Sequence, residues 1–260
     1  MDGQLRRLLA FILAVAVGSA HGQMLQAIVN SKAVVAGGST ATFDAVGNAN
    51  CNSATCGTNA TPASTLTYSV TVGSNSNRAF VVYVCLSGPS GTVQPSISGV
   101  TYASVSLSLY QHISGNYYCD IWKLADGTQP TTGANNVVVT MPSLIAADSV
   151  LSSGAISAYN VDQTTNLVAA SYAASSGTGT SATLTLGSSN ANDLVTTAVC
   201  SGSTGAQTQS FGTTRFSNAG DNHGACNVVS GATAVGATTA IAWTVVSDSW
   251  RTLGVAFKHA

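Results

Sequence analysis

Apolar and polar residues alternate along several stretches of the chain. In 65–72, 104–109 and 181–186, every second residue is apolar, and Ser or Thr fills most of the positions between them. Successive side chains of a strand point to opposite faces, so each stretch predicts a strand with one buried face. Threonine suits such a strand because its branched Cβ fits a pleated surface.

Other runs are apolar on both parities and predict strands that are covered on both faces. They are 79–86, 137–141, 194–200 and 253–257. Clusters of Gly, Asn, Ser and Pro separate the runs, as turns require. No helical stripe longer than two turns follows residue 22, and no fixed-period repeat supports a solenoid. We therefore expect an all-β fold, an antiparallel β-sandwich or a jelly-roll-like variant of it, with an N-terminal strand arm.

The first 22 residues have the layout of a secretory signal peptide. Arg6 and Arg7 precede the apolar stretch 8–17, and small residues follow it. Cleavage is expected after Gly22, with Ala20 as the alternative. The apolar run is shorter than the roughly 20 residues that a membrane span needs. The sequence thus predicts a secreted or cell-surface protein with no membrane span in the mature chain.

Residues 23–45 form the predicted strand arm. Leu25, Ala27, Val29, Ala33 and Val35 share one parity, and Gly37 and Gly38 follow them as a hinge. Two interpretations stand: the arm folds back into its own sheet, or it completes the sheet of a neighbouring copy. Donation that does not close into a ring would give a filament. The expected layout continues with an Asn- and Gly-rich disulfide loop at 46–63 and a β-sandwich domain at 64–260.

The chain has 6 cysteines, and an even number in an exported chain predicts disulfides. Proximity suggests the pairs Cys51–Cys56, Cys85–Cys119 and Cys200–Cys226, although sequence alone leaves the pairing open. The spacing contains no CxxC pair and no Cys–His cluster, so zinc is not expected.

Charged residues make up only 7% of the sequence, and all 9 acidic residues are Asp. The net charge of −1 gives no attraction for nucleic acid. A glycosidase needs two opposed carboxylates, and nothing in the spacing of the aspartates selects such a pair. The three histidines after residue 22, His112, His223 and His259, are interpreted as solvated loop or edge residues rather than as bases. We therefore expect a non-enzymatic protein without a catalytic site and without a cofactor.

Sugars and calcium are the remaining candidate ligands. Asn59 begins an N-glycosylation sequon, and Ser- and Thr-rich stretches suit O-linked sugars. Tyr117 and Tyr118 follow a Gly-Asn turn signal and are the candidates for glycan contact. The segment 221–224 offers oxygen ligands, but it lacks the spaced acids of a calcium loop. Structural calcium is therefore supported by no motif.

Several strings resemble an uncharacterised β-sandwich module of bacterial and phage surface proteins. They span 77–82, 97–102, 121–124, 135–140, 160–165, 193–195 and 250–255. The resemblance covers about residues 64–258 and implies a fold, not an activity. The layout of 23–45 resembles that of a donor-strand pilin subunit.

These observations lead to one functional expectation with two alternatives. The expectation is a structural subunit that self-associates outside the cell through its N-terminal arm, as a homo-oligomer or filament. A carbohydrate-binding or adhesive module is the second interpretation, and a glycoside hydrolase is the third.

Overall fold

The computed structural model describes residues 39–52, 65–87, 96–114, 117–141, 150–168, 173–186, 189–201, 207–219, 228–235 and 240–260. Contacts within the chain divide it into two units, Met1–Gly38 and Ser39–Ala260. All of the described residues belong to the second unit. The boundary falls directly after the predicted Gly37–Gly38 hinge.

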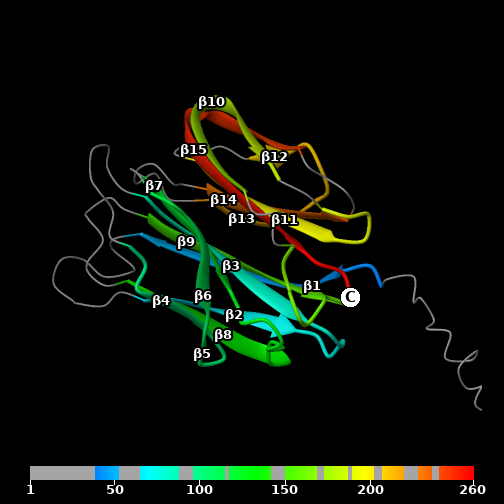
Figure 1. Ribbon diagram of the computed structural model, residues 1–260. Helices are drawn as coiled ribbons and strands as arrows, with labels where there is room; N and C mark the ends of the chain where they lie inside the picture. Colours follow the sequence, from blue (N-terminus) through cyan, green and yellow to red (C-terminus); the bar gives the residue numbers. More distant parts are fainter. Residues whose placement is uncertain are drawn as a thin grey trace, which may run out of the picture. The chain divides into compact units, whose positions relative to one another are not determined.

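The described residues form an all-β structure, and every strand ladder is antiparallel, as the alternation predicted (Figure 1). The five-stranded sheet contains, in spatial order, β1 (Thr42–Asn52), β9 (Val150–Tyr159), β3 (Ala79–Ser87), β7 (Tyr117–Lys123) and β6 (Ser108–Ile113). The four-stranded sheet contains β2 (Thr65–Val72), β8 (Gly133–Thr140), β4 (Gly99–Tyr102) and β5 (Val105–Ser106).

The six-stranded sheet is built mainly from the C-terminal part of the chain. It contains β10 (Ala173–Thr185), β15 (Ala240–Phe257), β11 (Leu194–Ser201), β14 (Val228–Val235) and β13 (Thr213–Ala219), and β12 (Thr208–Gln209) pairs with β15. The architecture is compatible with a β-sandwich, and a jelly-roll connectivity is not established. Within the described residues, no helix is long and apolar enough to cross a bilayer.

The five-stranded sheet is the middle layer of the second unit and has an apolar core on each face. Along β3, Phe80, Val82 and Val84 belong to the core shared with the four-stranded sheet. Val81, Tyr83 and Cys85 belong to the core shared with the six-stranded sheet. The prediction that 79–86 is covered on both faces is therefore confirmed, and so is the same prediction for 194–200 and 253–257. Each large apolar side chain buried in this way stabilises the fold by about 1.5–3 kcal/mol.

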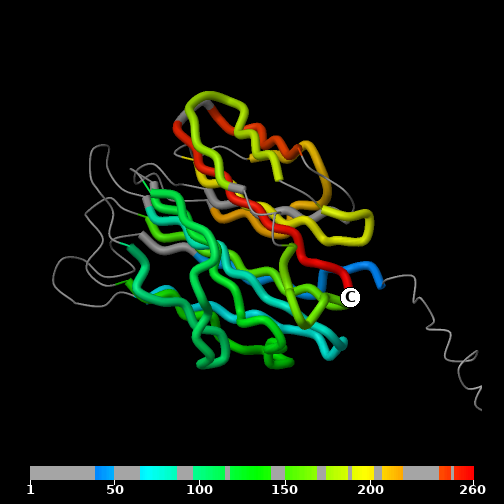
Figure 2. Tube along the Cα trace, in the orientation of Figure 1, coloured from blue at the N-terminus to red at the C-terminus, as the bar shows by residue number. Residues whose placement is uncertain are grey.

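A third core lies on the other face of the six-stranded sheet, where the β10–β15 ribbon folds over it (Figure 2). The ribbon has a register shift between Gly179 and Ser181. Beyond the shift, Leu184 and Trp243 pack with Val199 of β11 in one cluster. A Cβ on Gly254 would lie 2.7 Å from Cδ2 of Leu184 and 3.3 Å from the Thr196 carbonyl oxygen, so the ribbon packs closely against the sheet at this glycine.

Three expectations about strands were wrong. Residues 46–52 were assigned to a loop but continue β1, where Cys51 stands opposite Leu151 of β9. Glycine serves close packing here, because a Cβ on Gly47 would lie 2.6 Å from the carbonyl oxygen of Ser69. The run 137–141 is buried on alternate residues only, since β8 belongs to an outer sheet.

The third wrong expectation concerns residues 104–109, which do not form one strand with one apolar face. Leu107 is buried, whereas Val105 and Leu109 are 44% and 48% exposed. The chain passes at Leu107 from β5 in the four-stranded sheet to β6 in the five-stranded sheet. The alternation is interrupted because two edge strands meet there.

Candidate functional site

Many of the predicted site residues lie outside the part of the chain that the structure describes. These are the arm residues Leu25, Ala27, Val29, Ala33 and Val35, the hinge residues Gly37 and Gly38, Asn59, Cys56, Cys226 and the segment 221–224. Cys51 lies in β1, but its side chain is not described. The described candidates are three of the cysteines, two histidines, most of the aspartates and Tyr118.

The expectation that Tyr118 is exposed for glycan contact was wrong. The residue is only 5% exposed and belongs to the core between the five- and four-stranded sheets. Burial, with an added contribution from the Asp120 carboxylate, raises the pKa of Tyr118 to about 12. Tyr117 begins the same strand, and its side chain is not described.

The aromatic residues that the structure describes pack into the protein. Trp122, Trp243 and Trp250 are 8%, 0% and 6% exposed. Tyr110 and Tyr159 are half-buried. Among the described residues, no aromatic ring is classed as exposed, so no aromatic platform for a sugar is visible on this part of the surface.

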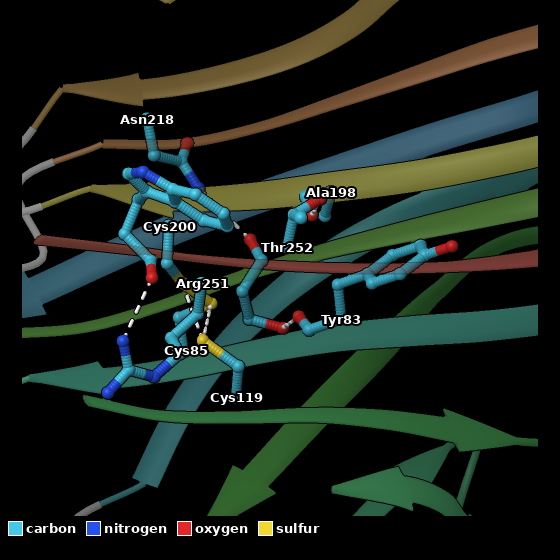
Figure 3. The surroundings of a disulfide bond; sticks show 10 residues. Tyr83, Cys85, Cys119, Ala198, Cys200, Asn218, Arg251 and Thr252 are labelled. Carbon is cyan, nitrogen blue, oxygen red and sulfur yellow. Dashed lines mark hydrogen bonds between the residues drawn. A yellow bond between two sulfur atoms is a disulfide. The ribbon is translucent and has the colours of Figure 1, made fainter. Parts of the chain in front are cut away.

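Cys85, Cys119 and Cys200 meet in the core between the five- and six-stranded sheets (Figure 3). Cys85 of β3 and Cys119 of β7 stand opposite each other in one ladder, and Cys200 reaches them from β11. A disulfide joins Cys85 to Cys200, and their Cα atoms are 6.6 Å apart. The Sγ atom of Cys119 lies 2.9 Å from the Sγ atoms of both.

This arrangement corrects the pairing inferred from proximity. Cys85 bonds to Cys200 rather than to Cys119, so the suggested pairs Cys85–Cys119 and Cys200–Cys226 are not the ones that form here. Closeness in sequence did not predict the disulfide partner, because the packing of the two sheets brings β11 over β3. In the reduced form, the three sulfurs lie close enough to hold a thiophilic metal ion, a set that the sequence spacing did not reveal.

Among the described residues, the surroundings of the cluster are mostly apolar and include the cationic side chain of Arg251. All three cysteines are at most 2% exposed. Arg251 stands opposite Cys200 in the β11–β15 ladder, so both side chains leave the same face of the sheet. Figure 3 shows Arg251 beside the three sulfurs, where it donates a hydrogen bond to the Trp250 carbonyl oxygen.

His112 lies on the edge strand β6, where a buried carboxylate contacts its ring. Its Nδ1 atom lies 2.8 Å from Oδ1 of Asp120, and the indole NH of Trp122 donates to Oδ2 at 3.1 Å. Asp120 is fully buried, whereas the His112 side chain is 35% exposed. Burial raises the pKa of Asp120, and the hydrogen bonds from its neighbours offset part of that increase. A buried carboxylate thus orients a half-exposed imidazole.

His259 repeats this arrangement at the C-terminal end of the chain. Its Nδ1 atom lies 2.7 Å from Oδ1 of Asp193, and its backbone NH donates to the same oxygen at 3.0 Å. Asp193 is fully buried and also accepts a hydrogen bond from the backbone NH of Asn190. Here the carboxylate fastens the last residues to the turn that precedes β11.

The other described carboxylates are also used locally. Asp162 accepts from two backbone NH groups and pairs with Lys258, and Asp126 pairs with Lys123. Asp44 accepts hydrogen bonds from Gly73 and from Ser157. Through these contacts the aspartates stabilise turns and strand ends. Each described carboxylate with printed contacts has a different set of partners, and no opposed pair of the kind a glycosidase needs is formed among them.

A shallow groove lies at the four-stranded sheet and has a volume of about 410 Å³. The residues that line it include Thr101, Ser104, Asn135 and Asn136, and none of the lining residues is charged. The turn beside it is strained, because Ala103 and Ser104 have φ angles of 49° and 65°. Such a two-residue hairpin turn usually carries Asn and Gly.

The longest described sheet edge belongs to β10. This strand has 13 residues and pairs with β15 on one side, and among the described strands it has no partner on the other. Its sequence AASSGTGTSATLT contains no charge and no proline. Proteins usually protect an edge with charge, proline or a bulge, and here the protection is one register shift. The edge is therefore suited to accept another strand.

Comparison with known proteins adds no assignment: no protein-family model matches the chain, and no curated protein is significantly similar to it.

Proposed function

We propose that the protein is a secreted structural subunit that assembles outside the cell by donating residues 25–36 to the β10 edge of a neighbouring copy. The observation that carries the proposal is the long, uncharged edge of β10. An added strand gains main-chain hydrogen bonds along such an edge, and its alternate side chains set the register.

Two further observations support this function. The division of the chain after Gly38 makes the residues that precede Ser39 a separate unit. Within that unit, 25–36 has the strand pattern described above and only one charged residue, Lys32. A disulfide in the core fits an oxidising compartment and agrees with the signal-like start of the chain. Sugars on Asn59 would be compatible with this location.

The first experiment compares the full-length secreted protein with a variant that lacks 23–36. Electron microscopy and sedimentation measure the assembled fraction. The wild-type protein is expected to form fibres or large oligomers, and the deletion variant is expected to remain a monomer. Adding a synthetic peptide of residues 23–36 should give a one-to-one complex with the deletion variant. A wild-type protein that stays monomeric would refute the proposal.

The second experiment tests the acceptor edge. Ser176 and Thr178 are exposed on β10, and the variant S176K/T178K places two positive charges there. Repulsion and desolvation of these charges should weaken assembly at least about ten-fold, which corresponds to about 1.4 kcal/mol. The matched control A134K/N136K adds the same charges to exposed positions of β8, a strand with neighbours on both sides. Equal assembly of both variants would show that β10 is not the acceptor.

A carbohydrate-binding function is the second candidate, and the groove beside Ser104 is the observation that favours it. Left-handed backbone at non-glycine residues is often kept at binding sites. A glycan array probed with the monomeric deletion variant tests this function. Binding that is lost in Asn136→Ala would support it, whereas an array without signal would count against it.

A further inference from the structure

Two edge strands, β10 of the six-stranded sheet and β6 of the five-stranded sheet, lie at the same end of the core between these sheets. We infer that the donated strand pairs with the first half of β10, 174–179, and turns its alternating apolar side chains toward β6. This inference rests on the assembly proposed above and makes β6 part of the acceptor surface. It is carried by the direction and the exposure of three side chains of β10.

The ladder between β10 and β15 fixes the direction of these three side chains. Residues directly opposite each other in an antiparallel pair point to the same face. Ala174 stands opposite Leu253, which belongs to the core shared with the five-stranded sheet. Ser176 and Thr178 follow at alternate positions, so they point to the same side. All three are exposed, so the inner face of β10 is uncovered along this half of the strand.

The stacking of the two sheets places β6 opposite this face. The Cys85–Cys200 disulfide holds β11 against β3, β15 contacts β7, and β10 contacts β6. In the β6–β7 ladder, Ile113 stands opposite Cys119, so its side chain points toward the six-stranded sheet. Ile113 and Tyr110 pack against the shared core but are only half-buried. Apolar surface is therefore partly uncovered between the two edge strands.

The other end of the same two sheets is closed by side chains. There β1 and β13 are the edge strands, and the Asn48 amide donates a hydrogen bond to the Asn218 amide oxygen. The Arg215 guanidinium lies 3.7 Å from the centre of the Phe43 ring, which also packs against the shared core. At the β6–β10 end, the small side chains of the three β10 residues leave the corresponding positions exposed. A strand added beside β10 supplies larger side chains at this end.

The sequence of the arm fits this surface. In the inferred arrangement, its alternating apolar residues lie over Tyr110 and Ile113 and remove apolar area from water. Lys32 belongs to the other set of positions, so its charge points to the outer side. This direction separates it from Arg251, which stands on the inner side opposite Ser176. The only charged residue of 25–36 is thus kept out of the buried contact.

A pair of single variants in the full-length protein tests the direction of the arm. Val29→Asp places a carboxylate among the inner apolar side chains and should raise the concentration needed for assembly at least about ten-fold. The matched control Asn30→Asp places the same charge on the outer side and should raise it less than about three-fold. Sedimentation measures both. Equal effects, or a larger effect of Asn30→Asp, would overturn the inference and leave strand donation standing, whereas a wild-type protein that never assembles would refute the proposed function itself.

Photo-crosslinking tests the position of the arm on the acceptor. Benzoylphenylalanine replaces Tyr110 in one full-length variant and Thr183, which is exposed on the other half of β10, in a second. Each variant is assembled with isotope-labelled wild-type protein and irradiated, and mass spectrometry maps the products between copies. We expect position 110 to crosslink to residues 25–36 of another copy and position 183 not to do so. The reverse result in assembled material would overturn the inference, and if a variant does not assemble, the comparison of Val29→Asp with Asn30→Asp decides.

Discussion

The contact between Gly154 and Phe216 gives the sharpest prediction about the stability of the layered core. Gly154 lies in β9 of the middle sheet, and Phe216 reaches it from β13 of the six-stranded sheet. A Cβ at residue 154 would lie 2.2 Å from Cζ of the ring, 2.3 Å from Cε2 and 2.6 Å from Cε1. Carbon atoms normally approach to about 3.5–4.0 Å, so the ring would have to move by more than about 1 Å.

We therefore expect Gly154→Ala to destabilise the protein. Overpacking of a core costs about 1–3 kcal/mol, and the better strand tendency of alanine returns about 0.5–1 kcal/mol. Because the overlap exceeds 1 Å, this site belongs in the upper half of the overpacking range, and the net loss should be about 1–2 kcal/mol. For a domain of this size, that loss corresponds to a decrease in Tm of about 2–8 °C. Urea unfolding followed by tryptophan fluorescence measures it, as a lower midpoint with an unchanged slope.

Two companion variants make this prediction specific. At Gly99, a Cβ meets no atom within 4 Å, so Gly99→Ala should be neutral or slightly stabilising. In the double variant G154A/F216L, the smaller side chain makes room for the new methyl group. The free energy of unfolding that the double variant loses should be about 1 kcal/mol smaller than the sum of the losses in G154A and in F216L. A neutral Gly154→Ala, or strictly additive costs, would show that the close approach does not govern this site.

Three other predictions concern polar contacts. The hydrogen bond from Lys258 lowers the pKa of Asp162, so the stability that this contact contributes is present above about pH 4 and is lost as the pH falls. The Asp162→Asn variant should therefore lose less stability in acid than the wild type, as measured by urea unfolding at a series of pH values. Burial raises the pKa of Tyr118 to about 12, so the contribution of this residue to the free energy of unfolding is constant below about pH 10 and declines above it. The Tyr118→Phe variant should therefore lose less stability at alkaline pH in the same assay. The Asn218 amide donates to two backbone carbonyls at 3.0 Å each, so Asn218→Ala should cost about 1–3 kcal/mol, and an unchanged unfolding midpoint would contradict this role.

The sequence predicted the strands whose patterns are set by burial alone. The run that became β3 is apolar on both parities because two cores contact it, and β2 alternates because only one core does. The central strand β9 was missed because its buried positions include Ser152, Ser153 and Ser157. The hydroxyl of Ser153 donates to the Tyr83 carbonyl, and that of Ser157 donates to Asp44. A pattern of hydrophobicity does not show that a serine is satisfied in this way.

The candidate sites could be predicted less well, because they depend on contacts between distant segments. His112 and Asp120 face each other across the β6–β7 pair, which becomes recognisable only once both strands and their register are known. Cys200 lies 115 residues from Cys85 in sequence, and only the stacking of two sheets brings them together.

The middle sheet has a consequence for how this chain can be divided or inherited. A fragment that ends before β10 would keep the first two layers but leave Val81, Tyr83 and Ile156 facing water. A fragment with only the C-terminal strands would lack the surface on which Leu253 and Phe257 rest. Neither half can fold on its own, so recombination within 160–175 would give two fragments that expose apolar surface and aggregate. Selection should thus act on the whole of Ser39–Ala260 as one heritable block.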